Sequence, residues 1–442
     1  MNESLLQFIS ACPTAYHAVE HTAALLDEAG FHRLSEHDFF QCLGNEHFPL
    51  LAQGYYVIRN GSSLIAFYLP LEQKFRSIRI TAAHGDSPAF KIKENAELCD
   101  GHTLRLSVEK YGGMLCATWM DRPLSVAGRV TVRTLDGLAV RNVDLKKPMA
   151  VIPSVAIHMN RSANESASYN PAVDMIPLCG EASDEGLLRR RVAEELGVSH
   201  EDILTTDLFL YNPDPGMEWN GYVSAPRLDD LQCAYASLSA FMQSGANPYG
   251  EAASMFCLFD NEEVGSQTKQ GAASTFLYDV ISVICESAGY THGDMTAMLS
   301  DSFMISCDNA HAVHPNHPEY QDKNHAVYMN GGVVIKYNAN QRYTTDAVSA
   351  GLFELICERA GVPIQRYANR ADMLGGSTLG SISNTKVSVN TVDVGLAQLA
   401  MHSAYETAGA RDTAYLTAAL NAFYRTELYA DGEGGYHVCS RT

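Results

Sequence analysis

The sequence has no apolar run that approaches the length of a membrane span, which takes about 20 consecutive apolar residues. Hydrophobic residues make up 46% of the chain, but polar residues interrupt them throughout. Residues 1–30 carry apolar side chains at helical spacing and lack the basic stretch and long apolar core of a secretory leader. We therefore expect no membrane partner and no export signal.

Basic side chains are scarce. Lys and Arg number 31 against 51 Asp and Glu, so the formal net charge is −20. Nucleic acids and anionic membranes are held by basic surfaces. This balance argues against both kinds of partner.

Closely spaced cysteine pairs are also missing. The 11 cysteines are odd in number, scattered along the chain, and contain no CxxC pair. This pattern predicts neither a disulfide framework nor a cysteine-rich zinc knot. A reducing cytoplasm is the location that such cysteine usage favours.

What the chain does contain is an α/β pattern interrupted by a β-rich segment. Residues 88–222 alternate apolar and polar side chains, with a hairpin turn at Asp136–Gly137. After residue 222, short β-rich runs alternate with helical patterns, which is typical of a sheet covered on both faces by helices. An early strand around Ile80 can join that sheet. The sequence therefore predicts a discontinuous α/β domain, residues 1–87 and 223–442, into which the β-rich segment is inserted.

Polar side chains that bind metals or move protons stand at the ends of several apolar runs. In open α/β sheets, ligand sites gather at the carboxyl ends of strands. Histidines and carboxylates suit zinc or manganese. The candidates are His84 and Asp86 after "SIRITAA", Asp229 and Asp230 at a helix start, Glu262 and Glu263 after "MFCLF", Asp308 after "MIS", and His402 before the last helix.

Each candidate also has an ordinary explanation. Asp229 can be a helix-capping acid, Glu262 and Glu263 can cap the helix that follows, and a lone His84 is more often a hydrogen-bonded structural residue. The crowding favours a different interpretation, because neighbouring carboxylates in a dry site repel unless a cation separates them. Periodicity alone does not show that these residues meet.

Several segments resemble the ordered signature motifs of the aspartyl aminopeptidase family, a family of co-catalytic zinc exopeptidases. They are "AAHGDSPAFKIK", "SAPRLDDLQC", "LFDNEEVGSQTKQGA", "CDNAHAVHPN", "VVIKYNANQRY" and "QLAMHSAYE". Such short motifs are weak singly but specific when they occur in family order. The resemblance implies a zinc-peptidase-type sheet covered by helices, with the inserted β-rich domain serving dimerisation and oligomerisation.

The resemblance also implies a role for each candidate. Two zinc ions per subunit, replaceable by Mn²⁺ or Co²⁺, would be held by five residues, with Asp86 orienting a histidine ligand. Glu262 would be the general base. Asp230 stands where relatives often carry Asn, and we expect it to touch none of the ligands. The five implied ligands are His84, Asp229 as the bridge, Glu263, Asp308 and His402, and the Asp229–Asp230 peptide is expected to be cis.

For substrate, the resemblance implies an aminopeptidase that releases N-terminal residues, with a preference for Asp and Glu. His158, His311, Lys336 and Tyr343 would contact the peptide, His158 from a neighbouring subunit of a dodecamer built from dimers. Pattern alone offers plainer explanations: a surface histidine at 158, and a lysine at 336 that reaches solvent or pairs with a structural carboxylate. Two other functions stay open, a di-zinc deacylase or carboxypeptidase and a non-catalytic, metal-stabilised assembly protein.

Overall fold

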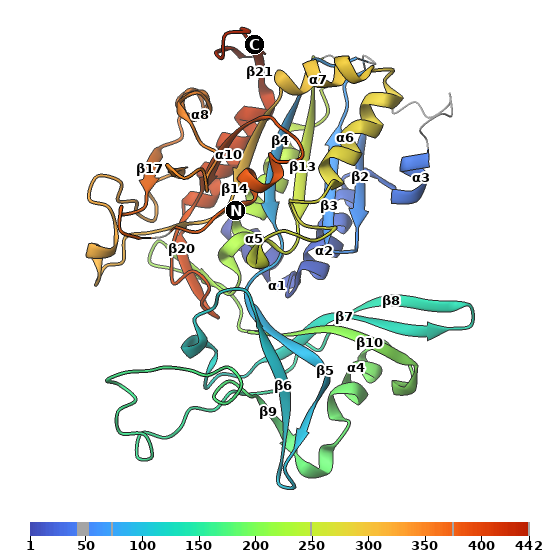
Figure 1. Cartoon of the computed structure of the whole chain (residues 1–442), viewed down its shortest axis with the longest axis vertical. Helices are drawn as coiled ribbons and strands as arrows, with labels where there is room; N and C mark the ends of the chain where they lie inside the picture. The colour runs from blue at the N-terminus through green and yellow to red at the C-terminus, as the bar shows by residue number, and fades with distance from the viewer. Residues whose placement is uncertain (42–52, 72–73, 248–249, 374, 441–442) are drawn as a thin grey trace.

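The computed structural model describes residues 1–41, 53–71, 74–247, 250–373 and 375–440. A large lobe of helices around a sheet lies at the top of Figure 1, and a smaller β-rich lobe lies below it. Among the described residues, no helix is long and apolar enough to cross a membrane.

Nine strands of the described chain form the main sheet, and the central strands are parallel. Their order is β1 (His32–Leu34), β2 (Gly54–Arg59), β3 (Ser63–Tyr68), β13 (Ala252–Phe259), β4 (Ser77–His84), β14 (Phe303–Cys307), β18 (Asn390–Gly395), β16 (Val333–Tyr337) and β17 (Ile364–Ala368). The early strand β4 thus joins the main sheet, as expected from the sequence, and lies between β13 and β14.

Strand β4 shows why this sheet is buried on both faces. Every residue from Ser77 to His84 is buried. Ile78 and Ile80 pack into one apolar core and Ala83 into the other. Alternate side chains point to opposite faces of a strand, so a run with apolar residues at both parities needs cover on both sides.

Helices supply that cover. One face carries α1 (Asn2–Ala11), α2 (Ala15–Glu28), α5 (Leu228–Ser244), α8 (Ala347–Ala360) and α10 (Asp412–Arg425). The other face carries α3 (Glu36–Gln41), α6 (Phe276–Ser287), α7 (His292–Ser300) and α9 (Leu379–Ser383). The predicted α/β fold, with its sheet covered by helices, is confirmed.

The β-rich lobe has its own sheet and its own core. Its six described strands run in the order β8 (Gly137–Asp144), β7 (Ser125–Thr134), β10 (Ile203–Tyr211), β5 (Ala89–Cys99), β6 (Thr103–Tyr111) and β9 (Leu178–Glu181). The predicted hairpin joins β7 to β8, and α4 (Leu187–Leu196) packs its apolar side chains into the same core. This core excludes the apolar residues of the main sheet.

Two smaller sheets complete the described chain. The first has the order β11 (Met217–Trp219), β12 (Tyr222–Ala225), β20 (Glu406–Gly409), β19 (Ala397–Leu399) and β15 (Ala310–His311), and the second is the hairpin of β21 (Thr426–Ala430) and β22 (Tyr436–Ser440). The pairing of β12 with β20 matters for the site, because α5 starts just after β12.

Candidate metal centre

The carboxyl ends of three parallel strands meet at one edge of the main sheet. His84 is the last residue of β4 and lies in register with Phe259, the last residue of β13. Strand β14 ends at Cys307, so Asp308 follows it directly. Segments distant in sequence therefore deliver their polar residues to one place, as the position of ligand sites in such sheets predicts.

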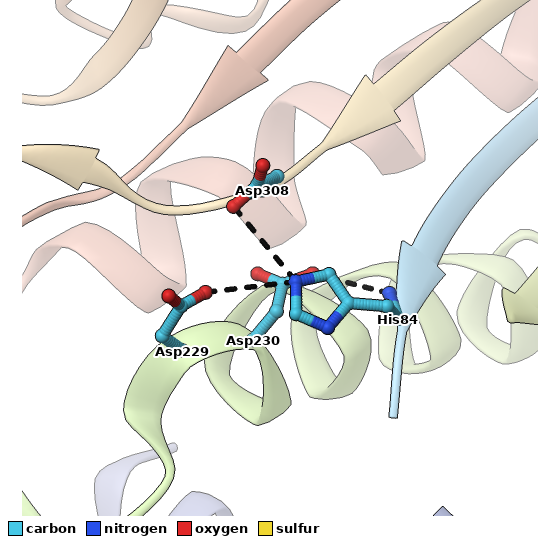
Figure 2. A group of neighbouring side chains, drawn as sticks. All are labelled: His84, Asp229, Asp230 and Asp308. Atoms are coloured by element: carbon cyan, nitrogen blue, oxygen red, sulfur yellow. Dashed lines mark hydrogen bonds and ion pairs between the residues drawn. The ribbon is translucent and has the colours of Figure 1, made fainter. Parts of the chain in front are cut away.

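The first group of ligand atoms, which we name the His84 site, comprises His84, Asp229 and Asp308. The Nε2 atom of His84 lies 3.6 Å from Oδ1 of Asp229 and 4.0 Å from Oδ1 of Asp308. Figure 2 shows one ring nitrogen of His84 facing both carboxylates, Asp229 from α5 and Asp308 from the end of β14. All three side chains are buried.

The second group, which we name the His402 site, comprises Asp229, Glu263 and His402. The Nε2 atom of His402 lies 3.2 Å from Oδ2 of Asp229 and 3.3 Å from Oε2 of Glu263. Glu263 belongs to a short 3₁₀ turn, Glu262–Val264, that follows β13. Asp229 therefore offers one carboxylate oxygen to each histidine.

The start of α5 is built to hold Asp229 at this junction. Arg227 adopts the left-handed conformation, and Asp229 and Asp230 have non-helical backbone angles. The peptide between Asp229 and Asp230 is cis, as predicted. The simple explanation of Asp229 as a helix cap is wrong, since its side chain faces the two histidines.

The residues present fit a pair of divalent cations. Oδ1 of Asp229 and Oε1 of Glu263 are buried atoms without a hydrogen-bond partner. Buried polar atoms are normally satisfied, so such atoms call for a missing partner. Two imidazoles and three carboxylates, each offering an atom to a compact group, are ligands that zinc accepts.

Burial shifts the titration of the crowded acids upward. Burial raises the pKa of Glu262, His84 lowers it, and the charges of Asp308 and Asp86 raise it, so that the pKa lies at about 8. Burial likewise raises the pKa of Glu263 well above its ordinary range, and that of Asp308 is also raised. Without a cation, the raised pKa leaves Glu262 largely protonated at neutral pH, because deprotonation would crowd negative charges in a dry site.

The pKa values of the two histidines are raised and that of Asp229 is lowered, so all three shifts favour the charged form. Burial lowers the pKa of His84, but the charge of Asp230 and the hydrogen bond to Asp86 raise it by more. The pKa of His402 is raised in the same way, by Asp229. Burial raises the pKa of Asp229, yet His402 and His84 outweigh it and leave that pKa lowered. The raised pKa values of His84 and His402 favour protonated imidazoles, whose positive charge would face the carboxylates where a cation would otherwise lie.

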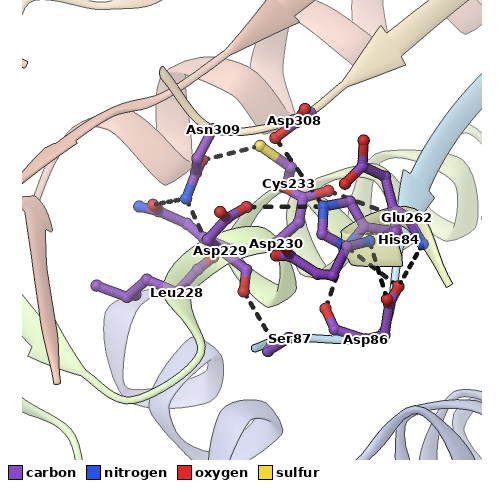
Figure 3. Close-up of polar contacts among 12 residues, drawn as sticks. His84, Asp86, Ser87, Leu228, Asp229, Asp230, Cys233, Glu262, Asp308 and Asn309 are labelled. Atoms are coloured by element: carbon purple, nitrogen blue, oxygen red, sulfur yellow. Dashed lines mark hydrogen bonds and ion pairs between the residues drawn. The ribbon is translucent and has the colours of Figure 1, made fainter. Parts of the chain in front are cut away.

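Asp86 organises the ends of β4 and β13 together. Its carboxylate accepts hydrogen bonds from the backbone N–H groups of Glu262 and Glu263, both at 3.2 Å, and lies 3.4 Å from Nδ1 of His84. Figure 3 shows these contacts converging below His84. Tyr111, the last residue of β6 in the β-rich lobe, donates to the same carboxylate at 2.6 Å. Asp86 therefore orients the imidazole and anchors the turn that carries both glutamates.

Asp230 is placed differently from our expectation. It is fully buried, and its Oδ2 accepts a hydrogen bond of 3.3 Å from the backbone N–H of His84. Its carboxylate also lies within reach of the ligand atoms of the His84 site (Figure 2). The expectation that it touches no ligand was wrong, because the non-helical turn directs both aspartates toward β4.

Sequence reasoning missed two residues that contact the centre. Tyr111 lies in the β-rich lobe and carries no local signal. Glu406 accepts hydrogen bonds from the backbone N–H groups of Asp229 and His402. Its signal was present, since it closes the motif "HSAYE", but a glutamate four residues after a histidine has no role that spacing alone can assign.

Of the four predicted substrate residues, the structure brings Lys336 and Tyr343 into contact. Lys336 is 2% exposed, with Nζ 3.5 Å from Oδ2 of Asp308 and 5.4 Å from the ring of Tyr343. The explanation that Lys336 reaches solvent is therefore wrong, and its carboxylate partner is itself a candidate ligand. His311 is exposed, with its ring edge-on to Tyr367. His158 is exposed in the long segment between β8 and β9.

An α/β sheet that gathers imidazoles and crowded, buried carboxylates at its carboxyl edge is the arrangement of a metal-dependent enzyme. The family described as Aminopeptidase I zinc metalloprotease (M18) matches residues 8–424. The chain therefore belongs to the M18 family, and it is a metal-dependent aminopeptidase. Family membership selects this activity over the deacylase, carboxypeptidase and non-catalytic alternatives.

Relatives match over nearly the whole chain. Proteins named probable M18 family aminopeptidase 2, from Clostridium acetobutylicum and Pseudomonas paraeruginosa, are each 40% identical over 96% of this chain and 98% of their own length. The cryo-EM structure of the Ape4 and Nbr1 complex superposes with a TM-score of 0.92 at 33% identity, covering 96% of this chain and 85% of that chain. The S. cerevisiae mApe1 dodecamer gives a TM-score of 0.82 at 28% identity, covering 96% of both.

Zinc should raise the melting temperature more at pH 8 than at pH 6. In the metal-free folded state, Glu262 and Glu263 keep protons that the unfolded chain releases near pH 4.5, so folding loses stability as the pH rises through their raised pKa values. Zinc bound to Glu263 would replace its proton, and the positive charge of the zinc would favour loss of the proton from the neighbouring Glu262, which removes the loss of stability. Calorimetry with zinc and with a chelator at both pH values measures the difference, in which titrating groups elsewhere cancel. An equal or larger zinc effect at pH 6 would contradict this account.

Proposed function

We propose that the chain binds two zinc ions, one at the His84 site and one at the His402 site, and removes the N-terminal residue of peptides. The observation that carries this proposal is the placement of Asp229, whose two oxygens face different histidines. A bridging carboxylate of this kind lets one acid serve two cations. Glu263 and His402 would complete one shell, and His84 and Asp308 the other.

Glu262 is the proposed general base. It follows β13 beside both sites, and its backbone is held by Asp86. Its carboxylate takes a proton from water as the water oxygen attacks the first peptide carbonyl, and it returns the proton to the leaving amine. When bound, the two zinc ions supply positive charge that acidifies water and stabilises a developing oxyanion. Glu263 faces His402 and would bind metal, whereas the adjacent Glu262 would act as the base.

Glu262→Gln should keep the fold and the bound zinc but lose about 10²–10⁴-fold in kcat, because the amide cannot accept the proton. Activity on peptides with free and blocked N-termini, with and without a chelator, is measured alongside zinc content. The exposed Glu286 on α6 provides a control, and Glu286→Gln should behave as wild type. Near-normal turnover of zinc-loaded Glu262→Gln would remove the base assignment, and cleavage of blocked peptides would remove the aminopeptidase assignment.

Lys336 is the proposed source of a preference for acidic N-terminal residues. Its ammonium is buried beside Asp308, with Tyr343 under it. A buried cation next to the reacting bond favours a carboxylate, because a neutral side chain of similar shape would leave the ammonium less well paired. Tyr343 and His311 would line the same pocket. The chain's net charge of −20 does not attract acidic peptides, so any selectivity has to arise locally.

Lys336→Met should lower kcat/KM for N-terminal Asp and Glu more than for Leu, narrowing the ratio between them. Steady-state rates on matched Asp, Glu, Asn and Leu peptides give that ratio, and zinc affinity is measured in parallel. Lys91→Met is the matched control, since Lys91 pairs with Asp207 at 2.9 Å in the β-rich lobe. An unchanged ratio with weakened zinc binding would show that Lys336 serves Asp308 instead of the substrate.

The β-rich segment 88–222 is the proposed oligomerisation domain of a dodecamer assembled from dimers. Exposed apolar side chains gather in its long segment between β8 and β9, on both sides of His158. They are Val155, Ile157, Met159 and Val173. Monomers rarely expose apolar side chains in such a cluster unless a partner covers them. His158 would then enter the active site of a neighbouring subunit and donate to the oxyanion.

His158→Ala should inactivate the enzyme without loss of zinc. Mixed oligomers of His158→Ala and Glu262→Gln should recover part of the activity, because some sites then combine an intact base with an intact neighbouring histidine. Activity after subunit exchange, verified by mass, is compared with each variant alone. Verified mixed oligomers that stay inactive would argue against a shared site.

A further inference from the structure

Glu406 is a buried acid that bonds to both ends of the His402 site without being one of its ligands. Its side chain is 2% exposed. Oε2 accepts the backbone N–H of Asp229 at 3.0 Å, and Oε1 accepts the backbone N–H of His402 at 2.7 Å. One carboxylate thus ties together two chain segments that carry ligands.

We propose that Glu406 is a positioning residue that sets the spacing between Asp229 and His402 and so determines the affinity of the His402 site for zinc. This inference rests on the proposed two-zinc function. The residue has the right anchorage for the task, because it begins β20 and lies opposite Ala225, at the end of β12. That pairing fixes Glu406 against the strand that leads into Asp229.

The backbone N–H groups of Asp229 and His402 depend on Glu406 as their acceptor because the backbone is irregular at both residues. Asp229 has φ −81° and ψ 111°, outside the helical region, although it lies at the start of α5. His402 has a positive φ of 68° in the turn after β19. Irregular backbone cannot use the regular hydrogen bonds of a helix or strand, so buried N–H groups there need a side-chain acceptor.

The hydrogen bonds of Glu406 support the His402 site more than the His84 site. Its hydrogen bonds reach two of the three residues of the His402 site, and the third, Glu263, is anchored by Asp86. At the His84 site, Glu406 holds only the shared Asp229, while His84 is held by Asp86 and Asp230. Groups that fix the ligands of a metal typically change its affinity by 10- to 100-fold when lost.

Asp412 gives a matched control for a merely structural role. It too is fully buried, and its carboxylate accepts two backbone N–H groups, from Asn330 at 2.6 Å and Gly332 at 3.1 Å. Those partners belong to the loop before β16 and are outside both metal sites. Asp412→Asn and Glu406→Gln should therefore both lower the melting temperature of metal-free protein, but only the second should alter zinc binding.

The experiment is a zinc titration of chelator-treated full-length protein against a chromophoric zinc chelator, performed as a double-mutant cycle. In Glu406→Gln, one nitrogen replaces an acceptor oxygen and opposes an N–H group. We expect one of the two zinc affinities to fall 10- to 100-fold. In the His402→Ala background, which lacks the His402 site, the same change should alter the remaining affinity by less than about threefold, because the two changes act on one site. Asp412→Asn should leave both affinities unchanged.

Other outcomes overturn the inference. Equal losses from Glu406→Gln with and without His402 would assign Glu406 a general structural role, as would unchanged affinities in the single variant. If Glu406→Gln does not fold, Glu406→Asp carries the same test, since the shorter acid keeps its charge but cannot span both N–H groups. A wild-type protein that binds fewer than two zinc ions overturns the two-zinc proposal and this inference together, whereas two normal ions with no effect at Glu406 overturn this inference alone.

Discussion

Negative charge packed into a dry space is the constraint on which this structure depends. Asp86, Asp229, Asp230 and Asp308 are all buried at one sheet edge, and Glu262 and Glu263 adjoin them. Carboxylates so placed either keep protons or gather cations, because mutual repulsion in a low dielectric is severe. The raised pKa of Glu262 and the lack of a hydrogen-bond partner for one oxygen each of Asp229 and Glu263 both follow from this crowding. We therefore expect folding and metal binding to be coupled in this protein.

Hydrogen bonds from several different elements hold the crowded carboxylates in place. Asp86 accepts the N–H groups of the turn after β13, and Glu406 accepts those of Asp229 and His402. Backbone donors neutralise part of the charge on these supporting acids and fix the ligand-bearing segments at the same time. Neither acid needs to bind a cation to shape the centre. The metal sites are thus an arrangement of strand ends held by buried carboxylates.

The β-rich lobe contacts the candidate metal centre and also carries the proposed assembly surface. Tyr111 at the end of β6 donates to Asp86, so a displacement of the lower lobe in Figure 1 would act on the orientation of His84. The same lobe exposes the apolar segment around His158. The proposed assembly of subunits through this lobe would give oligomerisation a physical route to influence the candidate metal centre. In the mApe1 dodecamer the same fold is found in an assembled form.

The α/β class, the β-rich interruption, the strands that end in polar residues and the family could all be predicted from the sequence. These follow from local pattern: Ile78 and Ile80 predict a buried strand wherever that strand lies, and His84 after it predicts a site at a sheet edge. Tertiary structure alone decided which residues meet. Asp230 turns toward His84 because the start of α5 is non-helical, Lys336 pairs with Asp308 because β16 is buried next to β18, and Glu406 spans Asp229 and His402 because β20 pairs with β12. Contacts such as Asp230 with His84 and Glu406 with Asp229 join residues more than a hundred positions apart and leave no periodic trace in a single sequence, so only the folded backbone brings them within hydrogen-bonding distance.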